Sequence, residues 1–223
     1  MHVFDTALKI RTAVDIFGEV GAKRFIREIV PWVFLRRFFF YSQSLKGPFP
    51  FPSCQLPFRL ELVKEKDLPF LLDVRPGFYH LSSLQKRLEE EHLCFLGWSG
   101  QNPVHIRWVF VNSLYLPYLR QKFVLRPGEV FVDEAYTRPE YRRHGVYSYA
   151  GYLMRPILQN LGYGRLICAF ASWNVSSQKG SEKLGMKKVG EGGYRNIFGI
   201  KKFYWEGSVQ YCGDGKISIK KEE

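Results

Sequence analysis

The sequence predicts an α/β protein built on one mixed, mostly antiparallel sheet with helices packed on its faces. Short apolar segments of strand length alternate with longer segments of helical spacing. The order is clearest in the second half, where we predict a strand at 129–137, a helix at 143–161, a strand at 165–171 and a helix at 174–184. The 223 residues, of which 46% are hydrophobic and 24% charged, suffice for one domain with or without an appendage.

The first half supplies the remaining elements. Residues 58–63 alternate between apolar and charged side chains, which predicts a strand. Segments 66–74 and 81–91 have helical spacing, and the second places three leucines on one face. Residues 92–98 and 104–111 predict an antiparallel pair around a turn at 100–102. Two closing strands, near 186–194 and 197–206, bring the sheet to about seven strands.

Residues 1–48 predict a basic, aromatic helical extension, separated from a main domain of residues 49–223 by the proline-rich segment 47–52. Between residues 20 and 46, six basic residues stand against Glu28 alone: Lys23, Arg24, Arg27, Arg36, Arg37 and Lys46. One interpretation is an anchor on anionic lipid. We favour the other, a helix packed on the main domain or on a dimer partner, because aromatic side chains usually bury against protein. The run 32–41 is too short and too charged to span a bilayer.

The four cysteines, at positions 54, 94, 168 and 212, are scattered and form no C-x-x-C pair. This pattern argues against a zinc site or a thioredoxin-like motif, and we predict no metal site. It fits a reducing compartment better than export. No basic segment followed by a clean apolar stretch is found at the N-terminus, so a signal peptide is not expected. We therefore expect a cytoplasmic protein, with peripheral contact at the inner face of a membrane as an open alternative.

A basic, glycine-containing turn separates the strand at 129–137 from the helix that follows it. The turn begins at Pro139 and runs through Arg142, Arg143 and Gly145. The first backbone N–H groups of a helix have no partner within the helix, and they lie at its positive end. Such a turn is suited to a phosphate or pyrophosphate, and Gly145 has no Cβ to obstruct a close approach.

A second segment, from Asn174 to Met186, makes this interpretation more specific. Asn174 follows a predicted strand and stands where it can cap the next helix, which ends at Gly185-Met186. Together the two segments resemble the GNAT superfamily of acyl-coenzyme A-dependent acyltransferases, over about residues 58–206. The first family motif, Pro-x-x-(Arg/Gln)-x-x-Gly-x-(Gly/Ala), is matched at Pro139, Arg142 and Gly145, with Tyr147 in place of Gly or Ala. The second is matched at Asn174, Ser177, Gly185 and Met186, with Ser181 where Tyr is frequent.

The resemblance implies the GNAT fold and transfer of an acyl group, most simply from acetyl-coenzyme A, to an amine by direct attack in a ternary complex. It implies that the backbone of Tyr136 or Thr137 polarises the thioester and that Asn174 and Ser177 lie beside the pantetheine arm. The pyrophosphate would lie on Arg142, Arg143, His144, Gly145, Val146, Tyr147 and Ser148. Because backbone groups make these contacts, the larger side chain of Tyr147 can point away and need not abolish binding. The net charge of +12 agrees with an anionic partner such as coenzyme A, nucleic acid, anionic lipid or an acidic carrier protein.

Glu134 and Asp133 are the candidate general bases. Neighbouring residues of a strand face opposite sides, so we expect only one in the cleft and select Glu134. The alternative is that either acid pairs with a nearby arginine. Ser181 occupies the position of the usual proton donor of the family. A different tyrosine, Tyr147 or Tyr152, or water would then protonate the leaving thiolate.

The sequence leaves open both the acyl acceptor and the wider function of the protein. Residues 113–120 are apolar and aromatic, and they predict either the wall of a pocket for an acyl chain or lipid-like amine, or ordinary packing. Two other functions remain. One is a coenzyme A-binding module without catalytic activity. The other is a membrane-surface or polyanion-binding protein that uses the basic N-terminal segment.

Overall fold

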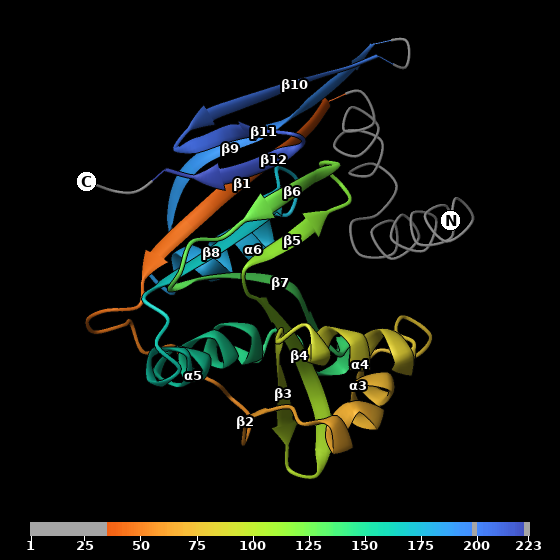
Figure 1. The fold of residues 1–223 in the computed structure, drawn as a ribbon. Helices are drawn as coiled ribbons and strands as arrows, with labels where there is room; N and C mark the ends of the chain where they lie inside the picture. Colours follow the sequence, from red (N-terminus) through yellow and green to blue (C-terminus); the bar gives the residue numbers. More distant parts are fainter. Residues whose placement is uncertain (1–34, 198–199, 221–223) are drawn as a thin grey trace.

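The computed structural model describes residues 35–197 and 200–220 (Figure 1). Its centre is an eight-stranded sheet, and of the strand pairs described in this sheet β7 with β8 is the one parallel pair. The spatial order of the strands is β10 (Ile200–Gly207), β9 (Lys187–Ile197), β1 (Leu35–Ser44), β8 (Arg165–Ala171), β7 (Glu129–Thr137), β4 (Asn102–Phe110), β3 (Leu93–Ser99) and β2 (Arg59–Leu62). The mixed, mostly antiparallel sheet predicted above is confirmed, with eight strands where about seven were expected.

Strand β1 corrects the prediction of a helical N-terminal extension for residues 35–44. It pairs antiparallel with β8 on one side and with β9 on the other, so it lies inside the sheet. Its aromatic run explains the difference: Phe38 and Phe40 join the core on one face of the sheet, and Tyr41 joins the core on the other. A continuous run of aromatic side chains favours a strand with both faces buried. The predicted helical face at 25–30 lies outside the described residues, and the domain boundary near residue 48 stays a prediction.

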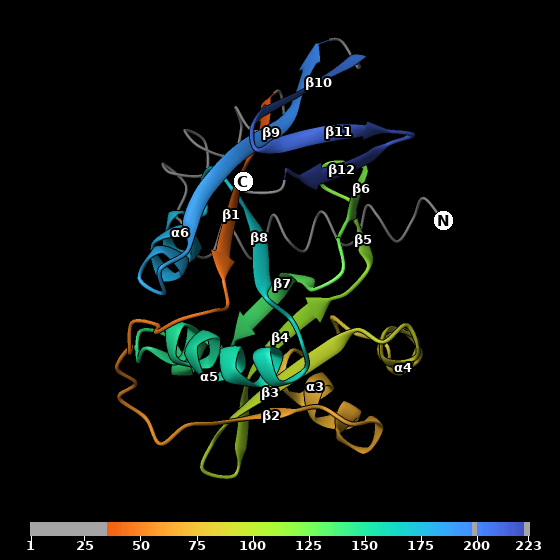
Figure 2. The same cartoon turned by 60° about the vertical axis from the view of Figure 1, so that its left-hand side comes forward.

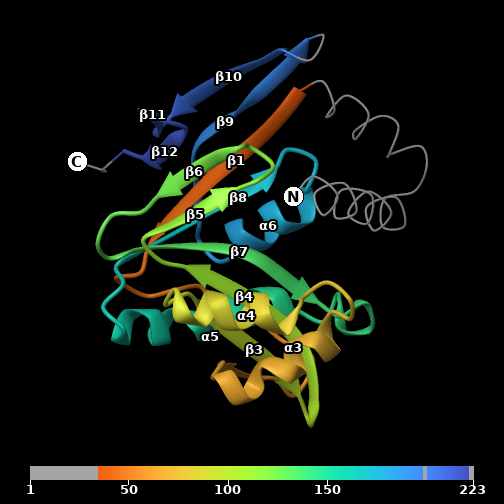
Figure 3. The ribbon, with the colours of Figure 1, turned by 45° about the vertical axis from the view of Figure 1, so that its right-hand side comes forward.

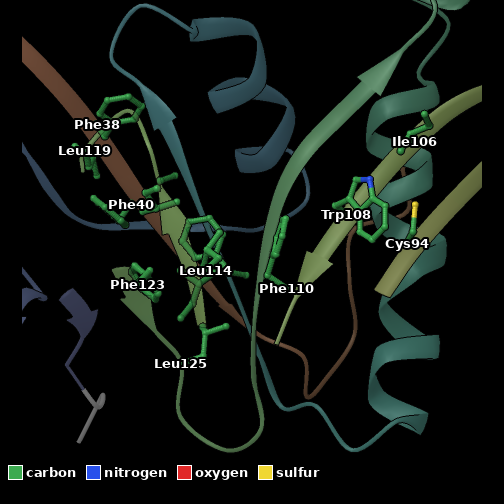
Figure 4. Close-up of a cluster of buried hydrophobic side chains, with 14 of the residues drawn as sticks. Phe38, Phe40, Cys94, Ile106, Trp108, Phe110, Leu114, Leu119, Phe123 and Leu125 are labelled. Atoms are coloured by element: carbon green, nitrogen blue, oxygen red, sulfur yellow. The ribbon is translucent and has the colours of Figure 1, made fainter. Parts of the chain in front are cut away.

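A second, four-stranded sheet was not anticipated from the sequence. It consists of β11 (Val209–Gly213), β12 (Lys216–Ile219), β6 (Gln121–Val124) and β5 (Ser113–Leu116), in that order. Its apolar side chains share one core with the main sheet, as Figure 4 shows for Leu114 and Phe123 beside Phe38 and Phe40. The segment 113–120 therefore forms most of a hairpin, and the packing interpretation holds for its buried leucines, Leu114, Leu116 and Leu119.

The helices lie on both faces of the main sheet (Figures 1 and 2). The short helix η2 (Glu65–Asp67), α3 (Leu68–Val74) and α4 (Leu81–Glu89) follow β2, and α3 and α4 contribute to the core that also contains the second sheet. Helix α5 (Val146–Asn160) packs on the opposite face, beside α6 (Val175–Glu182). A single turn, η3 (Pro139–Tyr141), connects β7 to α5. Among the described helices, none combines the length and the apolar character that crossing a bilayer requires.

Strands β7 and β8 separate part-way along their length (Figure 3). They are paired from Glu129 with Arg165 as far as Val132 with Cys168. Beyond this point β7 continues to Thr137 against β4, and β8 continues to Ala171 against β1. The edge of β7 that faces β8 therefore has no strand partner after Val132 in the described part of the chain. We call this separation the split, and the candidate site is built around it.

Candidate functional site

The turn before α5 presents a row of unpaired backbone donors. Arg143 and Gly145 both have positive φ, 68° and 82°, so the turn curls and Gly145 becomes the N-cap of α5. For the N–H groups of residues 143–148, no acceptor is found within the described residues. Successive N–H groups in such a turn, at the positive end of a helix, make a concave site for an anion. The predicted location of the phosphate loop agrees with this geometry.

The segment between β1 and β2 packs against this turn, which the sequence did not suggest. The N–H of Gln55 donates to the carbonyl of His144 at 2.9 Å, and the side chains of the same two residues meet at 3.2 Å. A Cβ at Gly145 would lie 2.2 Å from the carbonyl oxygen of Ser53. Gly145 is therefore required by the protein's own backbone as well as by its positive φ, independently of any phosphate.

Asn174 caps α6 as predicted. Its side-chain oxygen accepts from the N–H of Ser177 at 3.3 Å, and the hydroxyl of Ser176 donates to the same oxygen at 3.2 Å. Both residues thus lie at the start of α6, directly after β8 on the other side of the split. This observation establishes the capping role, while contact between Asn174 or Ser177 and a pantetheine arm stays a prediction.

A β-bulge overturns the expectation that Asp133 and Glu134 face opposite sides of β7. Trp108 pairs with Asp133 and Ile106 with Tyr136, so β7 holds two residues opposite Arg107 alone. Glu134 adopts a positive φ of 49°, as the extra residue of a bulge can. Glu134 pairs with Arg87 of α4, and Asp133 lies on the same side of the strand as Phe131, which joins the core that α3 and α4 cover, so both lie on that face.

Glu134 is fully engaged in an ion pair. Arg87 donates to its two carboxylate oxygens at 2.7 and 2.9 Å, and the Tyr79 hydroxyl lies 3.3 Å from the first of them. The guanidinium carbon of Arg87 also lies 4.9 Å from the centre of the Trp108 ring. Pairing with a nearby arginine, the alternative to a catalytic role, is thus what the geometry shows for Glu134.

Asp133 has the electrostatics of a base. It lies at the first position of β7 beyond the last pair with β8. Burial raises its pKa from 3.8 to about 7, and the negative charge of Glu134 adds to this shift. Tyr118 lies on the same face, with a buried hydroxyl that has no hydrogen-bond partner among the described residues. Its pKa is raised well above 10 by burial and, to a lesser degree, by Asp133.

The ring of Tyr147 is packed inside the protein, against Arg107 of β4 and against α6. Its ring packs against α6, where a Cβ on Gly180 would lie 3.1 Å from two ring carbons. Ser181, the residue after Gly180, lies close enough to lower the pKa of both the Tyr147 hydroxyl and the Cys168 thiol. Burial raises the pKa of Tyr147, whereas Arg107 and Ser181 lower it. Tyr147, which replaces a small residue in the first motif, thus packs near Ser181, which replaces a tyrosine in the second motif.

The two residues proposed to polarise a thioester are held at the end of β7. Arg142 donates from Nε to the carbonyl of Thr137 at 3.0 Å, and its guanidinium lies 5.5 Å from the Tyr136 ring centre. The hydroxyl of Thr137 meets Nδ1 of His105 at 2.8 Å. His105 is fully buried, and this burial lowers its pKa well below 6.5, so its ring is neutral. Arg142 therefore supports the strand and the loop at once.

No known family model matches the sequence, and no curated protein matches it. Among solved structures, a GCN5-related N-acetyltransferase from Sphaerobacter thermophilus is similar at a TM-score of 0.51 and 11% identity, over 77% of this chain and 50% of that one. A GNAT-family acetyltransferase from Colwellia psychrerythraea is similar at a TM-score of 0.51 and 12% identity, over 77% and 56%. This chain has the GNAT fold. It spans about half the length of these two proteins.

A weaker likeness is to the aminoglycoside acetyltransferase AAC(6')-Iy in complex with a coenzyme A bisubstrate analogue, at a TM-score of 0.47 and 15% identity, over 59% of this chain and 91% of that one. The two sequence motifs on which the resemblance to the GNAT superfamily was based lie beside the split. The first is at the start of α5 and the second is at the start of α6. The roles of the individual residues rest on the geometry described above.

Proposed function

We propose that this chain transfers an acyl group, most simply acetyl, from coenzyme A to the amine of a small or lipid-like molecule. One observation carries the proposal: the row of unpaired N–H groups before α5 lies at the end of the same strand that opens the split and bears Asp133. An anion site, an unpaired strand edge and a base of near-neutral pKa are the parts that such a transfer requires. The description of the two similar proteins as a GCN5-related N-acetyltransferase and a GNAT-family acetyltransferase agrees with it.

Coenzyme A supplies a pyrophosphate, an extended amide-containing arm and a thioester. In our proposal the N–H groups of residues 143–148 receive the pyrophosphate, with Arg142 and Arg143 adding positive charge. The unpaired edge of β7 around Tyr136 and Thr137 offers backbone groups to the arm and to the thioester carbonyl. The residues present fit this ligand, because the N–H groups of residues 143–148 have no acceptor among the described residues and none of these six residues is acidic.

Asp133 replaces Glu134 as the proposed base. An amine must lose a proton when its nitrogen bonds to the acyl carbon, and a carboxylate with a pKa of about 7 can accept that proton near neutral pH. Glu134 lacks this freedom because both its oxygens accept from Arg87. We assign Glu134 to holding α4 against β7, and its charge to raising the pKa of Asp133.

Tyr147 is the proposed donor to the departing sulfur. The family position of the donor holds Ser181, yet the hydroxyl of Tyr147 reaches Ser181 from α5. A phenol is a far stronger acid than an aliphatic hydroxyl, so Tyr147 is better suited to protonate a thiolate. Ser181 then orients the Tyr147 hydroxyl rather than donating itself.

The proposed acceptor side is aromatic and close to electrically neutral. Phe38 and Tyr118 stack with ring centres 4.4 Å apart, near Asp133. Arg87 neutralises Glu134, so the site lacks the surplus of negative charge that a polycationic acceptor would require. A monoamine with an apolar or aromatic body fits this wall best.

Calorimetry and a free-thiol assay test the proposal together. Acetyl-coenzyme A and free coenzyme A should bind and raise the unfolding temperature by mass action. Wild-type protein should then release the coenzyme A thiol in the presence of aromatic or aliphatic monoamines. Absence of binding would refute the proposed function. Binding without thiol release from a broad amine panel would instead favour a binding module without catalytic activity, the alternative that Ser181 in the donor position supports.

The N-terminal basic segment gives a separate arm of this test. Most of it lies outside the described residues, so lipid contact, polyanion binding and location in the cytoplasm stay predictions. Salt-dependent sedimentation with anionic vesicles or with DNA, in place of coenzyme A binding, would favour the surface-binding alternative.

A further inference from the structure

Arg107 is a buried cation in the middle of β4 with no carboxylate partner among the described residues. Only 3% of its surface is exposed. One Nη atom donates to the carbonyl of Tyr147 at 2.8 Å, and the guanidinium carbon lies 4.5 Å from the centre of the Tyr147 ring. Burial lowers the pKa of Arg107, as expected for a charge removed from water without a counter-ion. A buried, unpaired guanidinium is costly, which makes its contact with Tyr147 informative.

Two glycines on two helices make the space for this contact. A Cβ at Gly151 of α5 would lie 2.6 Å from the other Nη atom of Arg107. A Cβ at Gly180 of α6 would lie 3.1 Å from the Tyr147 ring. The guanidinium and the phenol ring are thus stacked between the two helices. Any larger residue at either glycine would displace one of them.

The stack determines where the phenol hydroxyl lies. The hydrogen bond from Arg107 fixes the first turn of α5 through the Tyr147 carbonyl, and the ring is held between the guanidinium and Gly180. The ring therefore lies against α6 at Gly180, and Ser181 is the next residue of that helix. A cation over the ring also favours the phenolate over the neutral phenol, because the opposite charge lies close to it in a site of low dielectric constant.

We propose that Arg107 is a positioning residue that holds Tyr147 at Ser181 and stabilises the negative charge that Tyr147 acquires when it protonates the leaving sulfur. This proposal rests on the proposed function. In the step, the amine nitrogen bonds to the acyl carbon and loses a proton to Asp133. The carbon–sulfur bond breaks, its electron pair goes to sulfur, and sulfur takes the Tyr147 proton. Solvent then returns a proton to Tyr147 and receives one from Asp133.

A double-mutant cycle in kcat tests the proposal, with Arg107→Met, Tyr147→Phe and the combined variant. We expect each single variant to lower kcat by at least about tenfold, because Tyr147→Phe removes the general acid and Arg107→Met removes the residue that positions it. The combined variant should be no slower than Tyr147→Phe by more than about twofold. Independent losses that multiply would overturn the proposal, because Arg107 would then act without Tyr147.

The pH profile supplies a readout that a purely structural role would not change. If Arg107 stabilises the phenolate, Arg107→Met should move the alkaline limb of kcat to higher pH, and Arg107→Lys should restore part of the original position. An unchanged alkaline limb would overturn the electrostatic part. Gly151→Ala is a second variant in case Arg107→Met fails to fold: it displaces the guanidinium while favouring the helix, and it should lower kcat in the same way.

The experiments distinguish a wrong role for Arg107 from a wrong proposed function. If wild-type protein releases no thiol, the proposed function is wrong and the catalytic role of Arg107 falls with it. If wild-type protein is active and the cycle is additive, the function stands and the role of Arg107 is wrong. Arg155→Met is the matched control, because Arg155 is a second buried arginine of the same layer that contacts Gln43 and Phe49 rather than Tyr147. It should lower stability and leave the alkaline limb in place.

Discussion

Asp133 and Glu134 are adjacent acids with different partners, and the difference predicts different variants. Asp133 follows the last residue of β7 that pairs with β8, and burial and the charge of Glu134 raise its pKa to about 7. A base must be deprotonated to act, so kcat should rise with pH up to about 7 and then level off. We expect Asp133→Asn to lower kcat about a hundredfold and to remove this acidic limb, while calorimetry shows unchanged coenzyme A affinity. An acidic limb that persists in the variant would exclude Asp133 as the base.

The same raised pKa predicts how stability depends on pH. Below about pH 4 the carboxyl is protonated in both states, and above about pH 7 it is ionised in both. Between these limits the unfolded chain releases a proton that the folded protein retains, so stability falls as pH rises. Relative to wild type, Asp133→Asn should gain up to about 4 kcal/mol in unfolding free energy between pH 4 and pH 8. Urea unfolding at both pH values measures the difference, and a constant difference would contradict it.

We expect substitution of Glu134 to affect the free energy of unfolding more than it affects kcat. Glu134→Gln leaves the half-buried guanidinium of Arg87 without its counter-charge, so we expect a loss of about 1–3 kcal/mol in unfolding free energy. The acidic limb of kcat should persist and move to lower pH, since a negative charge beside Asp133 is gone. Glu61→Gln is the control: Glu61 pairs with Arg59 at the surface, with both side chains about half exposed, and it should change stability by less than about 0.5 kcal/mol.

At the scale of elements, the segment between β1 and β2 joins the first strand of the sheet to the phosphate loop. It contacts the loop where Ser53 meets Gly145 and Gln55 meets His144. Gly145→Ala should therefore destabilise the protein by at least about 2 kcal/mol, through its positive φ and the clash with Ser53, and should weaken coenzyme A binding. Gly164→Ala, where a Cβ meets nothing within 4 Å, should be nearly neutral. Equal effects of the two substitutions on unfolding and binding would contradict this account.

The elements that the sequence predicted well are those with local signals. Strands β7 and β8 coincide with their predicted ranges, because each is a short apolar run bounded by turn residues. Strand β1 was mistaken for helix, because its basic and aromatic side chains repeat without a clear period and its partners are far along the chain. The second sheet was missed for the same reason: β12 pairs with β6 across most of the second half of the chain.

The sequence anticipated some structural features of the candidate site and missed others, and the binding and catalytic roles stay predictions. The loop at 142–148 and the cap at Asn174 depend on backbone and on nearest neighbours, which a motif specifies. We propose Asp133 rather than Glu134 as the base because of a single β-bulge. The bulge shifts the strand alternation by one residue, and the amino-acid composition gives no sign of it. Arg107 is visible in the sequence as a charged residue in the middle of the apolar run of β4. Its role could not be inferred from the sequence, because that role depends on its contact with the ring of Tyr147.

At the scale of the whole molecule, β1 connects parts that are otherwise separate. It lies between β8 and β9, and on one face its aromatic side chains pack against the second sheet, where Phe40 lies 6.0 Å from Phe123 between ring centres. Without β1, the pair β9–β10 has no strand connection to the rest of the main sheet in the described part of the chain. The pairing of Phe40 with Ala169 also joins residues far apart in sequence, which delays its formation during folding.

Phe40→Ala tests whether this strand unifies the fold. Phe40 is fully buried, so its loss removes apolar contacts and leaves a cavity between the two sheets, which we expect to lower unfolding free energy by about 3–5 kcal/mol. Circular dichroism and tryptophan fluorescence should still report one transition at one denaturant concentration, since both sheets depend on the same strand. Ile200→Ala at the exposed edge of β10, where the side chain is 75% exposed, should change stability by less than about 0.5 kcal/mol. Two separate transitions in Phe40→Ala would show that the second sheet and the main sheet unfold independently, and that β1 joins them in space without coupling their stability.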